Sequence, residues 1–181
     1  MLKATITRET RVAAIDGTTL EPRGRSVHYT LRAGIKSSYR KNIKLSVFVD
    51  TRSKKILSAR IRKKVVHDIK DVKYLIENSP IKPHMIVADK GYDAEWFRAF
   101  LADQEIRHCI PTRGPVRRGY HRKRERHDQR TYRRRPIVES SIYRLKQLYG
   151  RSVNCVTARN MRAEVLLRII LYNLSLIFNT I

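Results

Sequence analysis

Three acidic residues of this chain are placed where carboxylates could act on a phosphate ester. Asp16 and Asp89 each follow directly on a short apolar run typical of a strand, and Glu139 lies one turn after Pro136, where a helix is expected to begin. Mg²⁺ requires oxygen ligands in octahedral geometry, so a few convergent carboxylates can bind it. Two such ions about 3.5–4 Å apart can activate an attacking oxygen and stabilise a leaving one. We therefore expect Asp16, Asp89 and Glu139 to bind two Mg²⁺ or Mn²⁺ ions if the fold brings them together.

Each of these acids also has a purely structural interpretation. Asp16 precedes a glycine, and Asp-Gly is a common turn sequence. Asp89 opens the segment between a strand and a helix, and Asp93 suits the N-cap position of that helix. Glu139, in the first turn of a helix, would interact favourably with the helix dipole. Asp50 also ends a strand-like run but lies in an expected hairpin loop, so it is the reserve carboxylate.

The spacing of the residues around Glu139 adds a more specific signal. Glu139 and Lys146 would share one face of a helix, because seven residues come within about 20° of two full turns. With Tyr132 and Arg135 they form the pattern Y-x2-R-x3-E-x6-K, which resembles the signature of one large group of insertion-sequence DDE transposases. The sequences AIDGT and VADKGYD, which contain the first two acids, and VHD at Val66–Asp68 also resemble motifs of that group.

The resemblance extends from about Val12 to Asn173 and implies a function. It implies an insertion-sequence transposase in which the three acids are catalytic and Tyr132, Arg135 and Lys146 hold DNA phosphates. In such enzymes water cleaves a phosphodiester at the end of the element, and the freed 3′-hydroxyl then attacks target DNA. The implied partners are transposon-end and target DNA, with a homodimer assembled on the DNA. Family members usually carry an additional N-terminal DNA-binding region, whereas Asp16 lies close to the start of this chain, so a shortened, inactive copy is an alternative.

The order of the expected elements is that of an RNase H-like α/β fold. Three antiparallel strands come first, then helices alternate with strands, and a basic loop precedes two final helices, which suits a mixed sheet flanked by helices. The expected strands are 11–15, 44–49, 55–61, 85–88 and 106–110, and the expected helices are 68–78, 93–102 and 136–149. No element is assigned to residues 23–39. Helical spacing predicts that a last helix buries one face, made of Ala163, Leu166, Leu167, Ile170, Leu171, Leu174, Ile177 and Phe178.

The charge of the chain points to a polyanionic partner. Lys and Arg number 40 against 16 Asp and Glu, which gives a formal net charge of +24 at pH 7. An ordinary metabolic enzyme does not need such a field, whereas the phosphates of nucleic acid attract it. Residues 113–135 hold 11 Lys or Arg against two acids without apolar periodicity, so we expect an arginine-rich loop that tracks DNA phosphates. The charge alone would also fit a non-catalytic nucleic-acid-binding protein.

Length and composition are those of one folded domain. The 181 residues, 41% of them hydrophobic, can bury a core, and we expect residues 1–181 to form a single catalytic domain. Two separated cysteines give no basis for a disulfide framework. The first ten residues lack a secretory signal, and the apolar stretch 165–181 is too short and interrupted to cross a membrane. We therefore expect a cytoplasmic, nucleoid-associated protein without a membrane partner.

Overall fold

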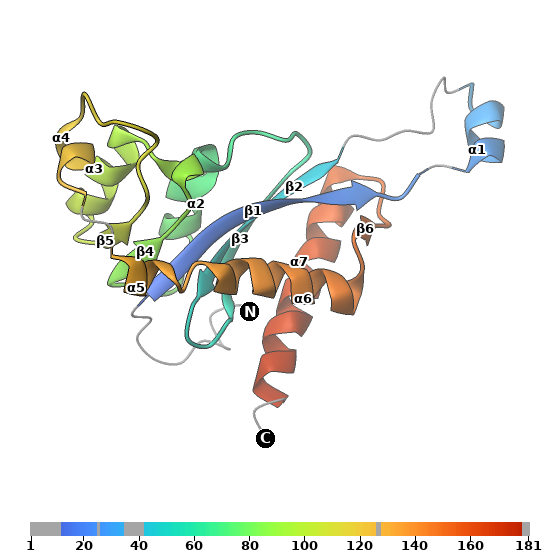
Figure 1. Ribbon diagram of the computed structural model, residues 1–181. Coiled ribbons are helices and arrows are strands. Elements are labelled where there is room, and N and C mark those ends of the chain that lie inside the picture. Colours follow the sequence, from blue (N-terminus) through green and yellow to red (C-terminus); the bar gives the residue numbers. More distant parts are fainter. Residues whose placement is uncertain (1–11, 25, 35–41, 126–127, 179–181) are drawn as a thin grey trace.

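A mixed β-sheet forms the centre of the protein. The computed structural model describes residues 12–24, 26–34, 42–125 and 128–178. The sheet has the strand order β3-β2-β1-β4-β5, and β6 pairs with the far end of β1 (Figure 1). The strands are β1 (Val12–Pro22), β2 (Ile43–Asp50), β3 (Ile56–Arg62), β4 (Met85–Val87), β5 (Arg107–Cys109) and β6 (Ser152–Val153). The mixed sheet flanked by helices that the sequence predicts is confirmed.

The first strand is longer than the sequence suggests. β1 pairs antiparallel with β2, which pairs antiparallel with β3, whereas β1, β4 and β5 run parallel. The Asp16–Gly17 sequence lies within β1 and pairs with Val47 and Ser46 of β2, so the interpretation of Asp16 as a turn residue is wrong. Backbone pairing with the long strand β2 continues beyond Gly17, so β1 does not end at this glycine. Asp16 therefore has the fixed backbone of a central strand.

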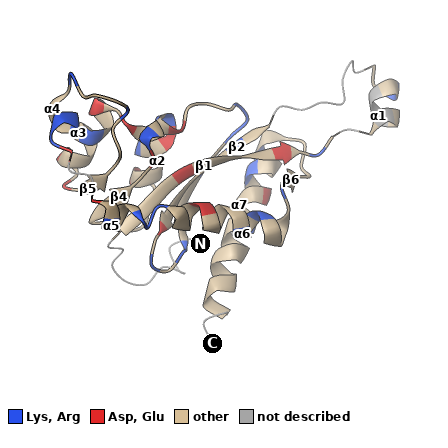
Figure 2. Cartoon of the chain, viewed as in Figure 1, with Lys and Arg blue, Asp and Glu red and all other residues tan. Residues whose placement is uncertain are grey.

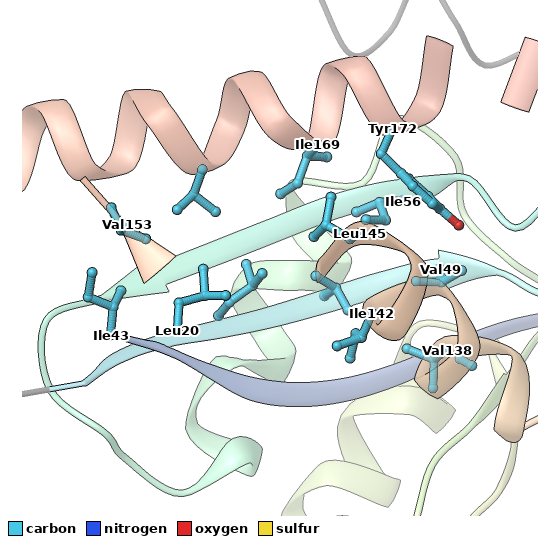
Figure 3. Packing of buried hydrophobic residues seen from close by; sticks show 14 of the residues in the cluster. Leu20, Ile43, Val49, Ile56, Val138, Ile142, Leu145, Val153, Ile169 and Tyr172 are labelled. Atoms are coloured by element: carbon cyan, nitrogen blue, oxygen red, sulfur yellow. The ribbon is translucent and has the colours of Figure 1, made fainter. Parts of the chain in front are cut away.

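Helices cover both faces of the sheet. α6 (Pro136–Tyr149) and α7 (Ala158–Phe178) lie on one face, and α2 (Val72–Glu77) and α3 (Glu95–Asp103) lie on the other (Figure 1). The first face forms the larger core, in which side chains of the strands meet those of α6 and α7 (Figure 3). It includes Leu20, Ile43, Val49, Ile56, Val138, Ile142, Leu145, Val153, Ile169 and Tyr172. The predicted start of a helix at Pro136 is confirmed.

Several short helices complete the fold. α1 (Val27–Arg32) lies between β1 and β2 in the sequence, where no element is assigned from the sequence, and it is placed away from the sheet (Figure 1). The 3₁₀ turn η2 (Asp68–Asp71) leads into α2, and η3 (Lys90–Tyr92) follows β4. The arginine-rich loop contains two single-turn helices, α4 (Tyr120–Lys123) and α5 (Gln129–Tyr132).

The last helix buries a different face from the one predicted. Its buried side chains are Met161, Val165, Ile169, Tyr172 and Asn173, whereas Leu167 is 59% exposed and Phe178 is 70% exposed. The Asn173 amide sets this rotation, because it accepts from the backbone N–H of Ile56 and donates to its carbonyl, both at 2.9 Å. A helix with apolar residues on both sides gives no periodic signal for the side that packs. Within the described residues no helix has the length and hydropathy needed to cross a membrane.

The rotation of α7 can be tested with a matched pair of substitutions. We expect Ile169→Ala to lower the free energy of unfolding by about 2–5 kcal/mol, because Ile169 is fully buried. Leu167→Ala removes the same kind of side chain from the exposed face, and we expect it to cost less than about 0.5 kcal/mol. Urea unfolding of both variants measures the difference. An equal loss in the two variants would contradict the observed rotation.

Candidate active site

The register of β1 and β4 brings the first two acids together. The parallel pairing ends at Ala14 and Val87; Asp16 lies two residues further along β1, and Asp89 lies two residues beyond the end of β4. Because the two strands are neighbours and run in the same direction, both carboxylates lie at the edge where β4 ends. The local backbone holds Asp89, whose Oδ1 accepts from the N–H of Gly91 at 2.7 Å and thereby caps η3. The expectation that these two acids share one edge of the sheet is met.

Asp16 is a carboxylate in a confined environment. Its side chain is 19% exposed, and its Oδ1 accepts from the N–H of Gly17 at 2.8 Å. Burial raises the pKa of Asp16, and the nearby carboxylates of Asp68 and Asp89 raise it further, while the Gly17 hydrogen bond and Arg135 partly offset these effects. Asp16 is therefore a desolvated carboxylate with two other acids nearby. A cation bound at this edge would favour the ionised form.

Arg135 links Glu139 to Asp16. Arg135 Nη1 lies 2.8 Å from Glu139 Oε1, and Arg135 Nη2 lies 3.9 Å from Asp16 Oδ2. The guanidinium thus connects an acid of β1 with an acid of α6, two segments more than a hundred residues apart in sequence. Arg135 Nε is buried and has no hydrogen-bond partner among the described residues. Figure 2 shows acidic positions in red on β1 and α6, and basic positions in blue near the start of α6.

Lys146 confirms that α6 crosses β1 with one face toward the strand. Its Nζ donates to Thr18 Oγ1 at 2.6 Å, two residues beyond Asp16. Burial lowers the pKa of Lys146, and the nearby Arg151 lowers it further. The alternative of a solvated helix face therefore does not describe Lys146, which is half-buried. Glu139 and Lys146 lie on the same face of α6, as their spacing predicts.

Tyr132 is the last residue of α5 and shortly precedes α6 in the sequence. It is partly buried and packs against the core on the α6 side of the sheet. Burial raises the pKa of Tyr132, Arg135 opposes that rise, and Asp89 and Glu139 are among the charges that add to it. The tyrosine therefore stays a phenol at neutral pH. Tyr132, Arg135 and Lys146 all lie around the edge of the sheet that carries the acids.

The carboxylates suit a divalent cation in their chemistry. They supply only oxygen ligands, and the Arg135 guanidinium already occupies the space between two of them as a positive charge. As the side chains stand, no three His, Cys, Asp or Glu side chains in the described part of the chain are close enough to hold a metal ion. Arg135 must therefore release Asp16 or Glu139 before these acids can share an ion.

Two further residues lie near the site: Asp68, which the sequence offered only as a group that could orient others there, and Lys44, which the sequence did not indicate. Asp68 lies against Gly17 so closely that a Cβ on this glycine would contact its carboxyl group, and Lys44 forms an ion pair with Asp68. The VHD motif is the only sequence signal for Asp68. Asp68 is the first residue of η2, and His67 is the N-cap of that turn.

Two other predicted roles have a clear outcome. Asp93 does not cap α3, whose N-cap is Ala94; its carboxylate instead binds Arg98 at 3.1 Å and Arg122 at 2.7 Å. The two arginines compete successfully for an acid that the local sequence would assign to a cap. Asp50 stays in the β2–β3 hairpin, where it accepts from the N–H of Ser53 at 3.0 Å and from its hydroxyl at 2.6 Å. These hydrogen bonds give Asp50, the reserve carboxylate, a structural role in the hairpin loop.

The mixed sheet has one acid within its central strand β1, a second just after the neighbouring parallel strand β4, and a third on a helix that packs on β1, and this arrangement is that of an RNase H-like fold. The chain belongs to the family described as Transposase DDE domain, which matches residues 7–174. A search of curated proteins finds no match.

Solved structures share this fold at low sequence identity. A piggyBac transposase in a synaptic complex with hairpin DNA is 13% identical, with a TM-score of 0.57 over 96% of this chain and 48% of that chain. An HTLV-2 integrase catalytic core in complex with magnesium is 17% identical, with a TM-score of 0.50 over 89% of this chain and 83% of that chain. A chain of a simian T-cell lymphotropic virus intasome in complex with the PP2A regulatory subunit B56 gamma matches with a TM-score of 0.50 at 16% identity, over 87% of this chain and 47% of that chain. At these identities the likeness concerns the fold.

Proposed function

We propose that this domain cleaves and joins DNA strands by metal-dependent phosphodiester chemistry at Asp16, Asp89 and Glu139. The observation that carries the proposal is the convergence of the three acids: Asp16 and Asp89 share one sheet edge, and Arg135 bridges Asp16 to Glu139. Strand ends and a packed helix hold these groups on rigid backbone, which a catalytic constellation requires. Among the solved structures that share this fold, the HTLV-2 integrase core is in complex with magnesium and the piggyBac transposase is in a synaptic complex with hairpin DNA.

Each acid would have a distinct task in the reaction. Asp16 and Asp89 would bind the cations from the sheet edge, and Glu139 would complete the second site from α6. When bound, two Mg²⁺ or Mn²⁺ ions supply Lewis acidity to the attacking and leaving oxygens. Arg135 would turn from Asp16 and Glu139 to a DNA phosphate, for which its planar guanidinium is suited. No covalent link between protein and DNA is needed.

The DNA would lie across α6 and the arginine-rich loop. Lys146 and Tyr132 flank the acids and would fix phosphates beside them. Residues 113–135 add a dense positive charge close to the same region, which gives salt-dependent and sequence-tolerant binding. We propose that this loop belongs to one catalytic domain spanning residues 1–181. This domain would act on transposon-end and target DNA as a homodimer. Its place of action would be the cytoplasm, in association with the nucleoid.

Strand cleavage tests the proposal directly. We expect the purified chain to nick or join labelled DNA carrying transposon ends in the presence of Mg²⁺ or Mn²⁺, and to lose that activity with a chelator. Asp89→Ala should be inactive because it removes one acid of the proposed site. Equal activity in the wild type and in Asp89→Ala would reject the assignment.

A non-catalytic DNA-binding protein is the second candidate, because the net charge of +24 is sufficient for tight binding by itself. In that case binding would be salt-sensitive, would need no divalent metal, and would not change when Asp16, Asp89 or Glu139 is replaced. A shortened, inactive copy would still bind cations through the three acids but would not cleave its ends. Measuring binding and cleavage on the same DNA separates these outcomes.

A further inference from the structure

We propose that Asp68 is a fourth carboxylate of the divalent-cation site, and that Lys44 is its internal counter-ion. This inference rests on the proposed function, because it concerns the cation site that the function requires. It assigns a role to the 3₁₀ turn η2, which the three-acid scheme leaves without one. It also explains why a buried lysine lies beside the first catalytic strand.

Asp68 lies directly against the strand that carries Asp16. Its carboxyl group contacts the backbone at Gly17, in the space that a Cβ would occupy. The pairing of β1 with β4 ends at Ala14, so the edge of β1 at Asp16 and Gly17 extends beyond the end of β4. Oxygens from the two faces of the sheet can therefore approach a common point around this edge. The electrostatic effect of Asp68 on Asp16, whose pKa it raises, is consistent with that proximity.

Lys44 is placed to neutralise Asp68. Its side chain is only 6% exposed, and its Nζ donates to Asp68 Oδ1 and, at 2.8 Å, to the carbonyl of Val66. A buried ammonium group is costly unless it is paired, so Lys44 depends on Asp68. The Asp68 side chain is 39% exposed, and among the described residues Lys44 engages only Oδ1. Asp68 can therefore accept a further positive partner from the solvent side.

The neighbouring Asp71 shows what a purely structural acid looks like in the same turn. Its side chain is fully buried and forms ion pairs with Arg60 at 3.4 Å and Arg62 at 2.6 Å. It also accepts from Ser46 Oγ at 2.8 Å. The acceptor capacity of Asp71 is thus used within the fold, whereas Asp68 has a single cationic partner and faces solvent.

A buried hydroxyl gives an independent indication of a ligand at this place. Tyr92 is 1% exposed, and its Oη has no hydrogen-bond partner among the described residues. Burial raises the pKa of Tyr92 well above its ordinary value, and the charges that raise it further include those of Asp68, Asp16 and Asp89. The hydroxyl is therefore a protonated donor close to the acidic cluster, and a buried donor without an acceptor costs about 1–3 kcal/mol. A carboxylate or water ordered by a bound cation would provide that acceptor.

Arg135 and Lys44 then have parallel roles. Arg135 bridges Asp16 and Glu139 from the α6 side, and Lys44 pairs with Asp68 from the α2 side. Both are positive charges within the protein that offset the repulsion among the acids. A divalent cation would compete with both, so removal of either positive charge should strengthen cation binding, and removal of Asp68 should weaken it.

The test is Mn²⁺ binding by the full chain without DNA, measured by calorimetry or by the electron paramagnetic resonance signal of free Mn²⁺. We expect Asp68→Asn to weaken Mn²⁺ binding about tenfold or more and Asp68→Glu to restore part of it. We expect Lys44→Met to strengthen binding about fivefold, because it removes a competing charge at nearly constant side-chain volume. Asp103→Asn, at an exposed acid at the end of α3, is the control for net charge and should bind as the wild type does.

The outcomes separate this inference from the proposed function. If Asp89→Asn weakens Mn²⁺ binding while Asp68→Asn and Lys44→Met bind like the wild type, the three-acid site stands and the role of Asp68 is refuted. If the wild type binds no Mn²⁺, or binds it as well as Asp89→Asn does, the proposed function fails and this inference fails with it. A Lys44–Asp68 pair with a structural role only would lower the melting temperature in both variants without changing the affinity for Mn²⁺. Thermal unfolding of each variant checks this last case and shows that it is folded.

Discussion

Asp16→Asn is expected to lower the rate of Mg²⁺-dependent DNA cleavage by about a thousandfold while leaving the protein as stable as the wild type. The loss corresponds to roughly 4 kcal/mol of transition-state stabilisation, within the several kcal/mol that a correctly placed metal ion supplies. The amide keeps the shape of the side chain and can still accept from the N–H of Gly17. It cannot supply the negative charge that holds a cation. Single-turnover cleavage of uncut DNA that carries transposon ends measures the chemical step.

The pKa of Asp16 determines how stability depends on pH. Its folded-state pKa is raised, chiefly by burial, so the folded protein holds this proton more tightly than the unfolded chain does. Between the unfolded and folded pKa values, the contribution of Asp16 to stability therefore decreases as pH rises. In Asp16→Asn this contribution is absent. In the absence of metal, the thermal stability of the variant relative to the wild type should therefore increase as pH rises through that window. A variant that unfolds at much lower temperature than the wild type would contradict the account, because Asp16 would then be a structural residue.

Arg98→Met is expected to lower the free energy of unfolding by about 3–5 kcal/mol, because it leaves two buried acids without their shared cation. The Arg98 side chain is fully buried and donates to Asp93 Oδ1 at 3.1 Å and to the carbonyl of Ile110 at 2.7 Å. It also forms an ion pair with Glu125, in the arginine-rich loop. One side chain therefore connects α3, the segment after β5 and the loop that we propose to bind DNA.

The effect of Arg98→Met should extend to DNA binding. Without Arg98, Glu125 loses an anchor, and the loop that carries the basic residues is held less firmly. Arg107→Met is the control, because Arg107 is exposed on β5, and we expect it to cost less than about 0.5 kcal/mol. Urea unfolding gives the stabilities, and fluorescence anisotropy gives the affinity for DNA. A loss of less than about 1 kcal/mol in Arg98→Met would mean that the network is not coupled to the fold.

The same network gives a second effect of pH, of opposite sign. Burial alone would raise the pKa of Asp93, but hydrogen bonds from Arg122, Arg113 and Arg98 outweigh it, so the pKa lies below its ordinary value. The stability that Asp93 contributes is thus complete above the ordinary pKa of aspartate. It is lost as pH falls through the lower, folded-state value. Acid should therefore loosen the arginine-rich loop while it relieves the charge of Asp16.

The local chain sequence determined the elements and the residues that could do chemistry. Apolar runs predicted β2, β3, β4 and β5 to within a few residues, although β1 extends well beyond its predicted end. Pro136 predicted the start of α6, and seven-residue spacing placed Glu139 and Lys146 on one face. These features are local, because side-chain periodicity and backbone preference act over a few residues. The parallel register that aligns Asp16 with Asp89 followed only from the assumption that β1 and β4 are neighbours.

Only the tertiary structure decided which groups meet. It placed Asp16 within a long strand, turned α7 so that Asn173 binds Ile56, and assigned Asp93 to two arginines instead of a helix cap. It also placed Arg135 between Asp16 and Glu139 and brought Asp68 against Gly17. The physical reason is that these contacts join segments far apart in sequence. Long-range hydrogen bonds and ion pairs outweigh local preferences where a buried polar group must find a partner.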